Sequence, residues 1–471
     1  RSDKDAWSSR VSMASSTLQL ITTSGRAERL HQILATVIVS LGPLASGLGK
    51  GYSSPALASL QNGRSKTVII SPQEASWIAG LSLLGALFGD IVGGIAMNVG
   101  RRRVIMFTAL PFTFAWILTV VADRVSLLLA ASFSAGLCSA ILVLASSIYI
   151  SEIASPDIRG TLCSVIKITA NVGLLVSYVL GTYLDWRQLA LAAAMVPLLL
   201  FLLVRYIPES PSFLMYQGKE DLALRSLQWL RGPEAIFEPD LLDIRNSASR
   251  RNGRLCTRLP SGTLIKPILI TCAIMFFQRF SGAFVLNYYA VTIFSSTFST
   301  LDPHSVAILH GTVQLLASLV FGALVDRVGR VPLLVIGSLL ITLSLGGLGC
   351  FVYVAAVSDT EIGLDWIPLM CVTVFNIAYS LGIGPIALLL VGELFPVEYR
   401  GLGGAVSTSF GHASGFVVVK TFVDFERLFH LSGTLWIYST ISLFGLLFIL
   451  LFVPETKGQR LEDIQRRMEL T

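Results

Sequence analysis

The sequence predicts an all-α membrane protein of twelve transmembrane helices, arranged as two pseudo-symmetric bundles of six. Of the 471 residues, 53% are hydrophobic and 14% are charged, whereas soluble proteins carry about 25% charged residues. Twelve apolar runs approach the roughly 20 residues that a helix needs to cross a bilayer. A three-part pattern of glycines and charged residues also occurs once in each half of the chain, in the same order. Such an internal repeat indicates two homologous halves.

The apolar runs form two groups of six, separated by one long polar segment over residues 208–263. The first group lies near residues 33–54, 74–97, 104–122, 126–150, 163–184 and 187–207. The second lies near residues 264–291, 304–325, 331–356, 366–391, 402–424 and 431–453. The predicted domains are an N-terminal cytoplasmic tail over 1–32, a first bundle over 33–207, a cytoplasmic linker over 208–263, a second bundle over 264–453 and a C-terminal cytoplasmic tail over 454–471.

Lysine and arginine are concentrated in alternate connections between these spans. With the N-terminus in the cytoplasm, the outer loops hold only Arg64, Lys66, Arg124, Arg187 and Arg427. The positive-inside rule therefore predicts that both termini are cytoplasmic. It also accounts for the net charge of +6, so we expect a lipid bilayer and no nucleic acid as partner. The six cysteines show no metal-binding spacing, and we expect no metal, cofactor or enzymatic activity.

Three local patterns predict where helices begin, break and lie on the surface. Ser71-Pro72-Gln73-Glu74 has the form of a capping box that starts the second span. Residues 219–231 show the periodicity of an amphipathic helix in the linker. Gly382-Ile-Gly384-Pro385 interrupts the tenth span, which indicates either a gating hinge or a passive kink.

The repeated pattern places acids and arginines at the inner ends of corresponding spans. Its copies are Gly93-Gly94…Asn98-Val-Gly100-Arg101-Arg102 with Gly322…Asp326-Arg-Val-Gly329-Arg330, Glu152…Arg159-Gly160 with Glu393…Arg400-Gly401, and Pro208-Glu209-Ser-Pro211 with Pro454-Glu455-Thr-Lys457. Ionisable groups at this depth are costly unless paired, so we expect Glu152 near Arg159 and Glu393 near Arg400. We interpret eight of these residues as a cytoplasmic conformational lock, the alternative being topogenic anchors: Arg101, Arg102, Glu152, Arg159, Asp326, Arg330, Glu393 and Arg400.

These motifs, together with Gly-Glu393-Leu-Phe-Pro and Pro-Glu455-Thr-Lys-Gly, resemble the sugar-porter branch of the major facilitator superfamily over residues 33–468. Gly51-Tyr52-Ser-Ser-Pro55, Trp229-Leu-Arg-Gly232 and Val419-Lys420-Thr-Phe422 are most similar to the insect trehalose facilitators. The resemblance implies two six-helix bundles around a central cavity that opens alternately to each side. It also implies a location in the plasma membrane and a monomer as the functional unit.

The chain departs from that family at most of the positions that contact the sugar. Lys167 stands where glucose facilitators carry Gln, Arg279 and Phe284 replace a Gln and an Asn, Leu388 stands in place of a Trp, and Gly411-His412 replaces Asn-Trp. Gln278, Asn171, Tyr288 and Tyr289 are the neutral candidates for sugar contacts that remain. His412 is either a packing residue or a proton relay. Outside the cavity, Asn98 and Ser132 replace an acid and an Arg, which weakens the expected lock.

Lys50, Lys167 and Arg279 are cations at mid-span, and we identify no carboxylate at the same depth. Each needs a partner or water, because an isolated charge in a bilayer costs at least about 2.5–3.5 kcal/mol. The partner is an anionic substrate, water or backbone carbonyls, unless the side chains extend to a membrane surface. We predict a facilitative transporter of trehalose or a hexose, without proton coupling because residues 31–60 contain no Asp or Glu. The alternatives are a carrier of a small organic anion and a sensor-like relative that does not transport.

Overall fold

A computed structural model of the chain describes residues 2–61, 68–155, 158–231, 264–358, 364–395 and 400–457. These residues are almost all helical, and no strand occurs among them. The first half contains α1 (Ser2–Gln61), α2 (Pro72–Ala96), η1 (Met97–Val99), α3 (Arg101–Val121), α4 (Val125–Ile153), α5 (Arg159–Tyr183), α6 (Trp186–Leu203) and η2 (Val204–Tyr206). The connection contains α7 (Pro211–Tyr216) and α8 (Glu220–Arg231). The second half contains α10 (Ile265–Phe280), α11 (Ala283–Tyr288), α12 (Ala290–Thr297), α13 (Pro303–Val328), α14 (Arg330–Val357), α15 (Trp366–Leu381), α16 (Ile383–Leu394) and α17 (Arg400–Phe452).

In the described part of the chain, ten helices are long and apolar enough to cross a membrane. The difference from twelve has two causes. Helix α17 joins the eleventh and twelfth spans through His430, whose φ of 58° is not helical. The seventh span is divided into α10, α11 and α12, each shorter than a membrane crossing. The arrangement therefore agrees with the predicted all-α fold of twelve spans.

A glycine marks one break in the seventh span and the break in the tenth, while the other break in the seventh span, between α11 and α12, falls at Tyr289. Gly282 has a φ of +82°, which L side chains rarely adopt, and it separates α10 from α11. Gly382 ends α15 and precedes α16, and a Cβ there would lie 2.7 Å from the carbonyl oxygen of Ala378. The break predicted at Gly382-Ile-Gly384-Pro385 is thus confirmed, with Pro385 in the first turn of α16. Its role as a gating hinge stays a prediction.

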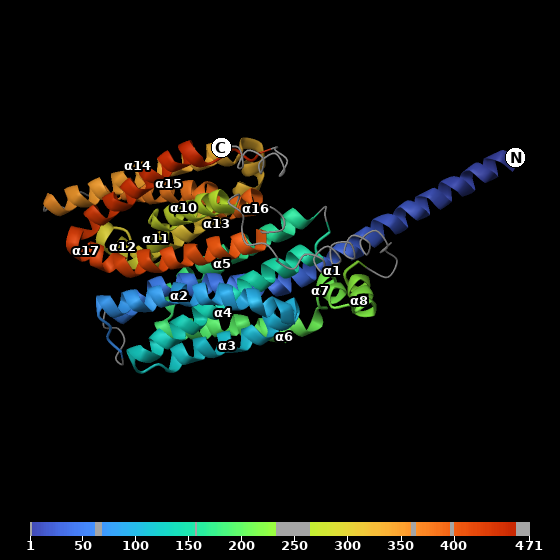
Figure 1. The fold of residues 1–471 in the computed structure, drawn as a ribbon, viewed down its shortest axis with the longest axis horizontal. Helices are drawn as coiled ribbons and strands as arrows, with labels where there is room; N and C mark the ends of the chain where they lie inside the picture. The colour runs from blue at the N-terminus through green and yellow to red at the C-terminus, as the bar shows by residue number, and fades with distance from the viewer. Residues whose placement is uncertain are drawn as a thin grey trace.

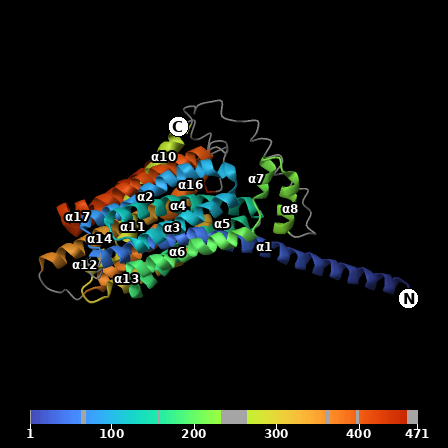
Figure 2. The same cartoon turned by 90° about the horizontal axis from the view of Figure 1, so that it is seen from below.

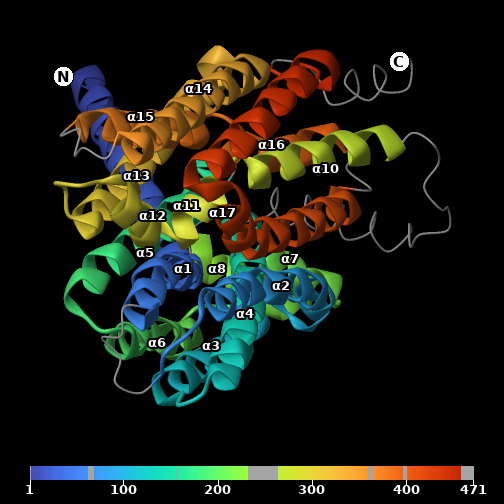
Figure 3. The same cartoon turned by 90° about the vertical axis from the view of Figure 1, so that its left-hand side faces the viewer.

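The helices sort into two groups that meet along a limited interface. Figure 3, which looks along the bundle, shows α1–α6 on one side and α10–α17 on the other. The two groups adjoin where α2 runs beside α17 and α5 beside α13. Helix α1 projects beyond the bundle at the end where α7 and α8 lie (Figures 1 and 2). We call this end, which carries Arg101 and Arg330, the basic end, and the opposite end, which carries Gln73 and Asp424, the far end.

The connection between the halves begins as two short helices that lie against the first half. Helix α8 buries Ala223, Leu227 and Leu230 and exposes Leu222, which confirms the amphipathic pattern in this region. Trp229 of α8 packs edge-on against His31 of α1, with ring centroids 5.0 Å apart. Residues 232–263 lie outside the described residues, so the predicted linker limits of 208–263 stay a prediction.

Helix pairs within the first half pack closely at glycines. A Cβ on Gly136 of α4 would lie 1.9 Å from the carbonyl oxygen of Ser82 on α2, and one on Gly47 of α1 would lie 1.9 Å from that of Ala170 on α5. Small residues at such contacts let backbones approach closely, which favours helix association in lipid. The packing of α4 on α2 and of α1 on α5 therefore requires glycine at these two positions.

We predict that Gly136→Ala destabilises the protein by at least about 1–3 kcal/mol, because the added methyl group collides with backbone that cannot move freely. The matched control is Gly94→Ala, since a Cβ on Gly94 meets nothing within 4 Å and alanine favours the helix by roughly 1 kcal/mol. Thermal unfolding of the detergent-solubilised variants measures whether Gly136→Ala lowers the melting temperature and Gly94→Ala does not. Equal melting temperatures for the two variants would contradict the packing argument.

Candidate functional site

The repeated motifs assemble into one polar cluster in each half, at the basic end. In the first half, Glu152 at the end of α4 pairs with Arg101 at the start of α3, with Oε1 2.7 Å from Nη2. The hydroxyl of Ser210 donates to the second oxygen of the same carboxylate. Arg101 also lies over the ring of Phe213 at 4.9 Å. Residues from all three parts of the pattern therefore meet at this point.

Glu209 completes the first cluster by accepting a hydrogen bond at the start of α3. The backbone N–H of Arg102 donates to its Oε1 at 2.9 Å. A carboxylate at a helix N-terminus is favourable because the first N–H groups have no partner within the helix. Gly100 precedes the helix with a φ of +127°, and a Cβ there would lie 2.7 Å from Oε2 of Glu209. Glycine at this position thus leaves room for the carboxylate.

The second cluster repeats this geometry. Glu393 pairs with Arg330 at 2.9 Å and accepts a hydrogen bond from Oγ1 of Thr456 at 2.5 Å. Glu455 accepts from the backbone N–H groups of Arg330 at 3.1 Å and Val331 at 2.9 Å, at the start of α14. The repeated residues therefore make corresponding hydrogen bonds in the two halves.

The structure corrects the expected partner of Glu152. That carboxylate pairs with Arg101, whereas Arg159 donates to the carbonyl oxygen of Ala154 at 3.4 Å. The expectation was wrong because Arg159 begins the next helix, while α3 packs along α4 and presents Arg101 to it. The side chains of Asp326 and Arg400 lie outside the described residues. Both ion pairs stay within one half, and the role of these residues as a lock stays a prediction.

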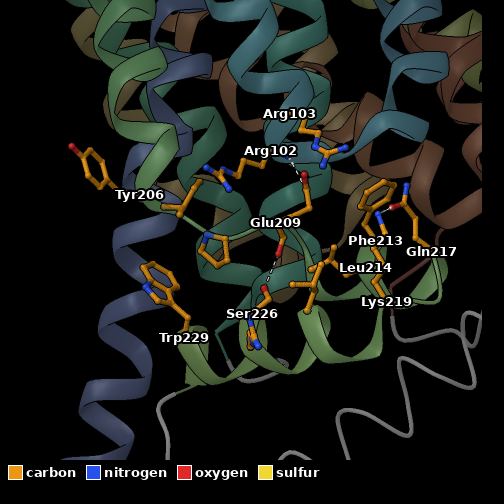
Figure 4. Close-up of a pocket in the computed structure, with 14 residues that line it drawn as sticks. Arg102, Arg103, Tyr206, Glu209, Phe213, Leu214, Gln217, Lys219, Ser226 and Trp229 are labelled. Atoms are coloured by element: carbon orange, nitrogen blue, oxygen red, sulfur yellow. Dashed lines mark hydrogen bonds between the residues drawn. The ribbon is translucent and has the colours of Figure 1, made fainter.

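A pocket of about 470 Å³ opens beside the first cluster. Figure 4 shows Arg102, Glu209 and Ser226 on its walls, together with the hydrogen bond from the Ser226 hydroxyl to the backbone carbonyl of Glu209. Its lining comes from the first half and from the connection in α7 and α8. A solute path between the two halves needs walls from both, so we do not assign the substrate to this pocket.

Contacts between the halves occur at the far end and in the middle of the bundle. At the far end, Gln73 of α2 donates to Asp424 of α17 at 2.5 Å and accepts from Lys420 at 3.2 Å. The Nζ atom of Lys420 lies 3.8 Å from Oδ2 of Asp424, one helical turn away, which makes an i,i+4 ion pair. The contacts nearer the middle are those of Ser54 with the backbone of Val291, Tyr178 with the carbonyl of Asn287, and Ser82 with Tyr288.

Charged residues of both halves meet at the centre. Lys50 on α1 and Lys167 on α5 are exposed although they lie within spans, and Lys50 is within electrostatic range of both Lys167 and Arg279 of α10. Arg279 packs on the ring of Phe284, with its guanidinium carbon 4.1 Å from the ring centroid. A Cβ on Gly411 of α17 would lie 3.3 Å from the guanidinium.

Asp90 supplies a carboxylate at this depth, which corrects the expectation that none exists. The Nδ1 atom of His412 lies 2.9 Å from its Oδ2, so a hydrogen bond joins α2 to α17 across the interface. The signal was present in the sequence, because Asp90 is an acid well inside the apolar run over 74–97. His412 therefore contacts the other half of the protein.

The neutral candidates take different positions. Gln278 donates to the carbonyl oxygen of Gly384 at 2.6 Å, and its buried Oε1 has no partner among the described residues. The buried Nδ2 of Asn171 is likewise without a partner in that part of the chain. Tyr289 donates to the carbonyl of Val419 at 3.3 Å, and Leu388 is 58% exposed. Asn171 and Gln278 are thus the candidates with free hydrogen-bonding capacity.

A buried histidine network was missed by sequence reasoning. Asn376 of α15 donates to Nδ1 of His310 at 2.5 Å, which leaves the proton on Nε2 to donate to Asn287 at 3.0 Å. Asn287 therefore faces α13. Polar residues inside apolar runs were the available signal, since buried polar groups are normally hydrogen-bonded.

Comparisons with known proteins agree with this architecture. Residues 35–468 match the family model described as "Sugar (and other) transporter". The chain is 37% identical over 442 residues to the facilitated trehalose transporter Tret1 of Drosophila mojavensis, covering 93% of this chain and 51% of that protein. The Tret1 protein of Polypedilum vanderplanki is 36% identical, with coverages of 93% and 88%. The chain therefore spans about half the length of the first of these relatives. The family and these relatives are transporters rather than enzymes.

Two solved structures share the fold. The inward-open conformation of the xylose transporter XylE from E. coli has a TM-score of 0.77 at 23% identity, covering 92% of this chain and 98% of that one. The proton:xylose symporter XylE bound to 6-bromo-6-deoxy-D-glucose has a TM-score of 0.74 at 24% identity, with coverages of 94% and 100%. At this level of identity the likeness concerns the arrangement of the helices.

The cluster around Glu455 predicts a dependence of stability on pH. Burial raises the pKa of Glu455, but backbone N–H groups of Lys457, Val331, Arg330 and Thr456 lower it more, so the pKa lies below its usual range. The stabilisation is therefore present above the unfolded-state pKa of about 4.3 and is lost as the pH falls through the lower folded-state value. We expect Glu455→Gln to cost about 1 kcal/mol at pH 7, since the site is partly exposed to solvent.

The measurement is the melting temperature of wild type and Glu455→Gln from pH 7 to pH 3. The difference between them shrinks below about pH 4 as the wild-type carboxylate becomes protonated. Asp123→Asn, at an exposed position between α3 and α4, serves as a control with little effect at either pH. A difference that does not vary with pH would show that the carboxylate charge is not responsible.

Proposed function

The chain belongs to the sugar transporter family, and from this premise we propose that it carries a sugar, trehalose or a hexose, by alternating access and without proton coupling. We further propose the plasma membrane as its location, with both termini in the cytoplasm. The curated relatives are named facilitated trehalose transporters, which supports trehalose as the first substrate to examine.

The distribution of contacts between the halves supports alternating access. Hydrogen bonds across the interface join Gln73 to Asp424 at the far end and Asp90 to His412 in the middle. At the basic end, the two ion pairs of the repeated motifs each stay within one half. Such an arrangement lets the halves separate at the basic end while they remain joined at the far end.

Sugar recognition requires neutral donors and acceptors with free capacity. Asn171 and Gln278 offer an amide nitrogen and an amide oxygen that are buried and have no partner among the described residues. A buried polar group without a partner costs about 1–3 kcal/mol, and a substrate hydroxyl would satisfy it. This pair, one residue from each half, is the observation that carries the proposal of a sugar.

The absence of an acid in the first span supports uniport. Residues 30–61 of α1 contain no Asp or Glu, so no carboxylate stands there to exchange a proton with the solute path. Asp90 is hydrogen-bonded to His412 in this state. The sensor-like alternative differs from a uniporter in that a sensor binds the sugar without moving it across the membrane.

We expect purified protein in vesicles to exchange labelled trehalose or glucose in a counterflow assay, with the rate unchanged by a protonophore. Asn171→Ala should lower exchange at least tenfold, because the lost amide leaves a substrate hydroxyl unpaired. Leu222→Ala, at an exposed position on α8 of the connection, is the control. Binding of sugar without exchange would favour the sensor, and loss of exchange with the protonophore would overturn uniport.

Asp424→Asn should weaken closure at the far end, because it replaces the acceptor shared by Gln73 and Lys420. In a cysteine-free background, Ser82→Cys lies at a contact between the halves and reports opening by its reaction with an impermeant thiol reagent. We expect Asp424→Asn to raise the labelling rate several-fold. Asp123→Cys, between α3 and α4, should label equally with or without Asp424→Asn. An unchanged rate at position 82 would exclude this contact as part of the closure.

A further inference from the structure

Five of the positions where this chain departs from its family come together at the centre of the molecule: Lys167, Arg279, Phe284, Gly411 and His412. Arg279 stacks on Phe284, and Gly411 adjoins its guanidinium. His412, next to Gly411, lies within electrostatic range of Arg279 and Lys50, and Lys167 is within range of Arg279. Residues that differ from the family and are far apart in the sequence therefore lie close together in the structure.

Arg279 fits because its neighbours on α17 are glycines. A Cβ on Gly411 would lie 3.3 Å from Nη2 and 3.5 Å from Nε, and one on Gly415 would lie 3.7 Å from Cδ. The Asn that the family carries at the first of these positions would extend into the guanidinium. Arg279 and Gly411 are thus complementary, and the buried Nε of Arg279 has no hydrogen-bond partner among the described residues.

Among the described residues, one acid lies near the three cations at this centre. Asp90 is the acidic group within electrostatic range of Arg279, and its carboxylate is engaged by His412 at 2.9 Å. No hydrogen bond or ion pair joins Lys50 or Lys167 to another residue of the described chain. Lys50 lies eleven residues before the end of α1, about 16 Å along the helix axis, which is too far for its ammonium to reach the far end.

We propose that the central site binds a polyhydroxylated anion, of the class of sugar acids and sugar phosphates. This inference rests on the proposed function, because it assigns to the same transport site a further class of solute that carries a negative charge besides the hydroxyl groups of a sugar. Lys167 and Arg279, supported by Lys50, hold the anionic group. Lys167 and Asn171 are four residues apart on α5 and so share a face, while Gln278 precedes Arg279 on α10. The amide atoms of Asn171 and Gln278 that have no partner among the described residues then bind the hydroxyl groups of the same solute.

The alternative is that water alone solvates the lysines. Water accounts for Lys50 and Lys167, which are exposed. It does not account for Arg279, whose Nε atom is buried and unpartnered while its guanidinium lies on an aromatic ring. A fixed, partly desolvated cation with a free donor is suited to a carboxylate or phosphate oxygen.

The test compares neutral and anionic solutes in the same vesicles. Counterflow is measured with trehalose, glucose, gluconate, glucuronate and glucose 6-phosphate, for wild type and for Lys167→Gln and Arg279→Gln. We expect at least one anion to exchange in wild type, and both variants to reduce that exchange tenfold or more. We expect neutral sugars to be unaffected or improved, because Gln restores the carboxamides of glucose facilitators. Lys219→Gln, an exposed cation on the connection, is the matched control and should behave as wild type.

Binding is measured separately, as the shift in melting temperature caused by each solute. Both variants should fold, because each removes an isolated charge from the bilayer region, and their unliganded melting temperatures report this. The proposal is supported if gluconate, glucuronate or glucose 6-phosphate raises the melting temperature of wild type but of neither variant. If no solute is exchanged in that case, only the proposed transport is contradicted. Exchange of neutral sugar with no anion exchanged or bound overturns the proposal and leaves the proposed transport intact. No anion bound and no solute exchanged overturns both.

Discussion

A charged or polar group inside a bilayer is costly unless another group of the protein or water meets it, and this requirement governs the placement of ionisable residues in the molecule. At the basic end the requirement is met twice in the same way. Glu152 and Glu393 each join an arginine to a hydroxyl group, while Glu209 and Glu455 each accept from the first N–H groups of a helix. These contacts hold the helix ends of each half in defined positions at the basic end.

The same requirement applies to the tenth span, which is broken between α15 and α16. A break between α15 and α16 leaves backbone groups at the two helix ends without partners inside their helices. Gln278 of α10 donates to the carbonyl of Gly384, in the first turn of α16, at 2.6 Å, so a side chain of a neighbouring span contacts the backbone beside the break. The consequence is a direct connection between the break and the central residues, because Gln278 adjoins Arg279 in the chain.

Sequence reasoning succeeded where the signal was local. Apolar length predicted the spans, and paired glycines with Pro385 predicted the break at Gly382. It failed where the partner lies far along the chain. Glu152 and Arg101 are 51 residues apart, and nothing in their spacing distinguishes Arg101 from the nearer Arg159. The contact of Asp90 with His412 spans 322 residues, so it depends on how the two halves meet.

The polar residues fall into two sets with different structural roles. Residues that recur in both halves, such as Arg101 with Arg330 and Glu209 with Glu455, make their contacts inside their own half. The described contacts between halves come from residues outside the repeated motifs, including Gln73, Asp90 and His412. Residues of the repeated motifs therefore stabilise each half, and residues outside these motifs form the described contacts of the interface. Because the central cations belong to the second set, the charge of the interface was free to change without loss of either half's internal structure.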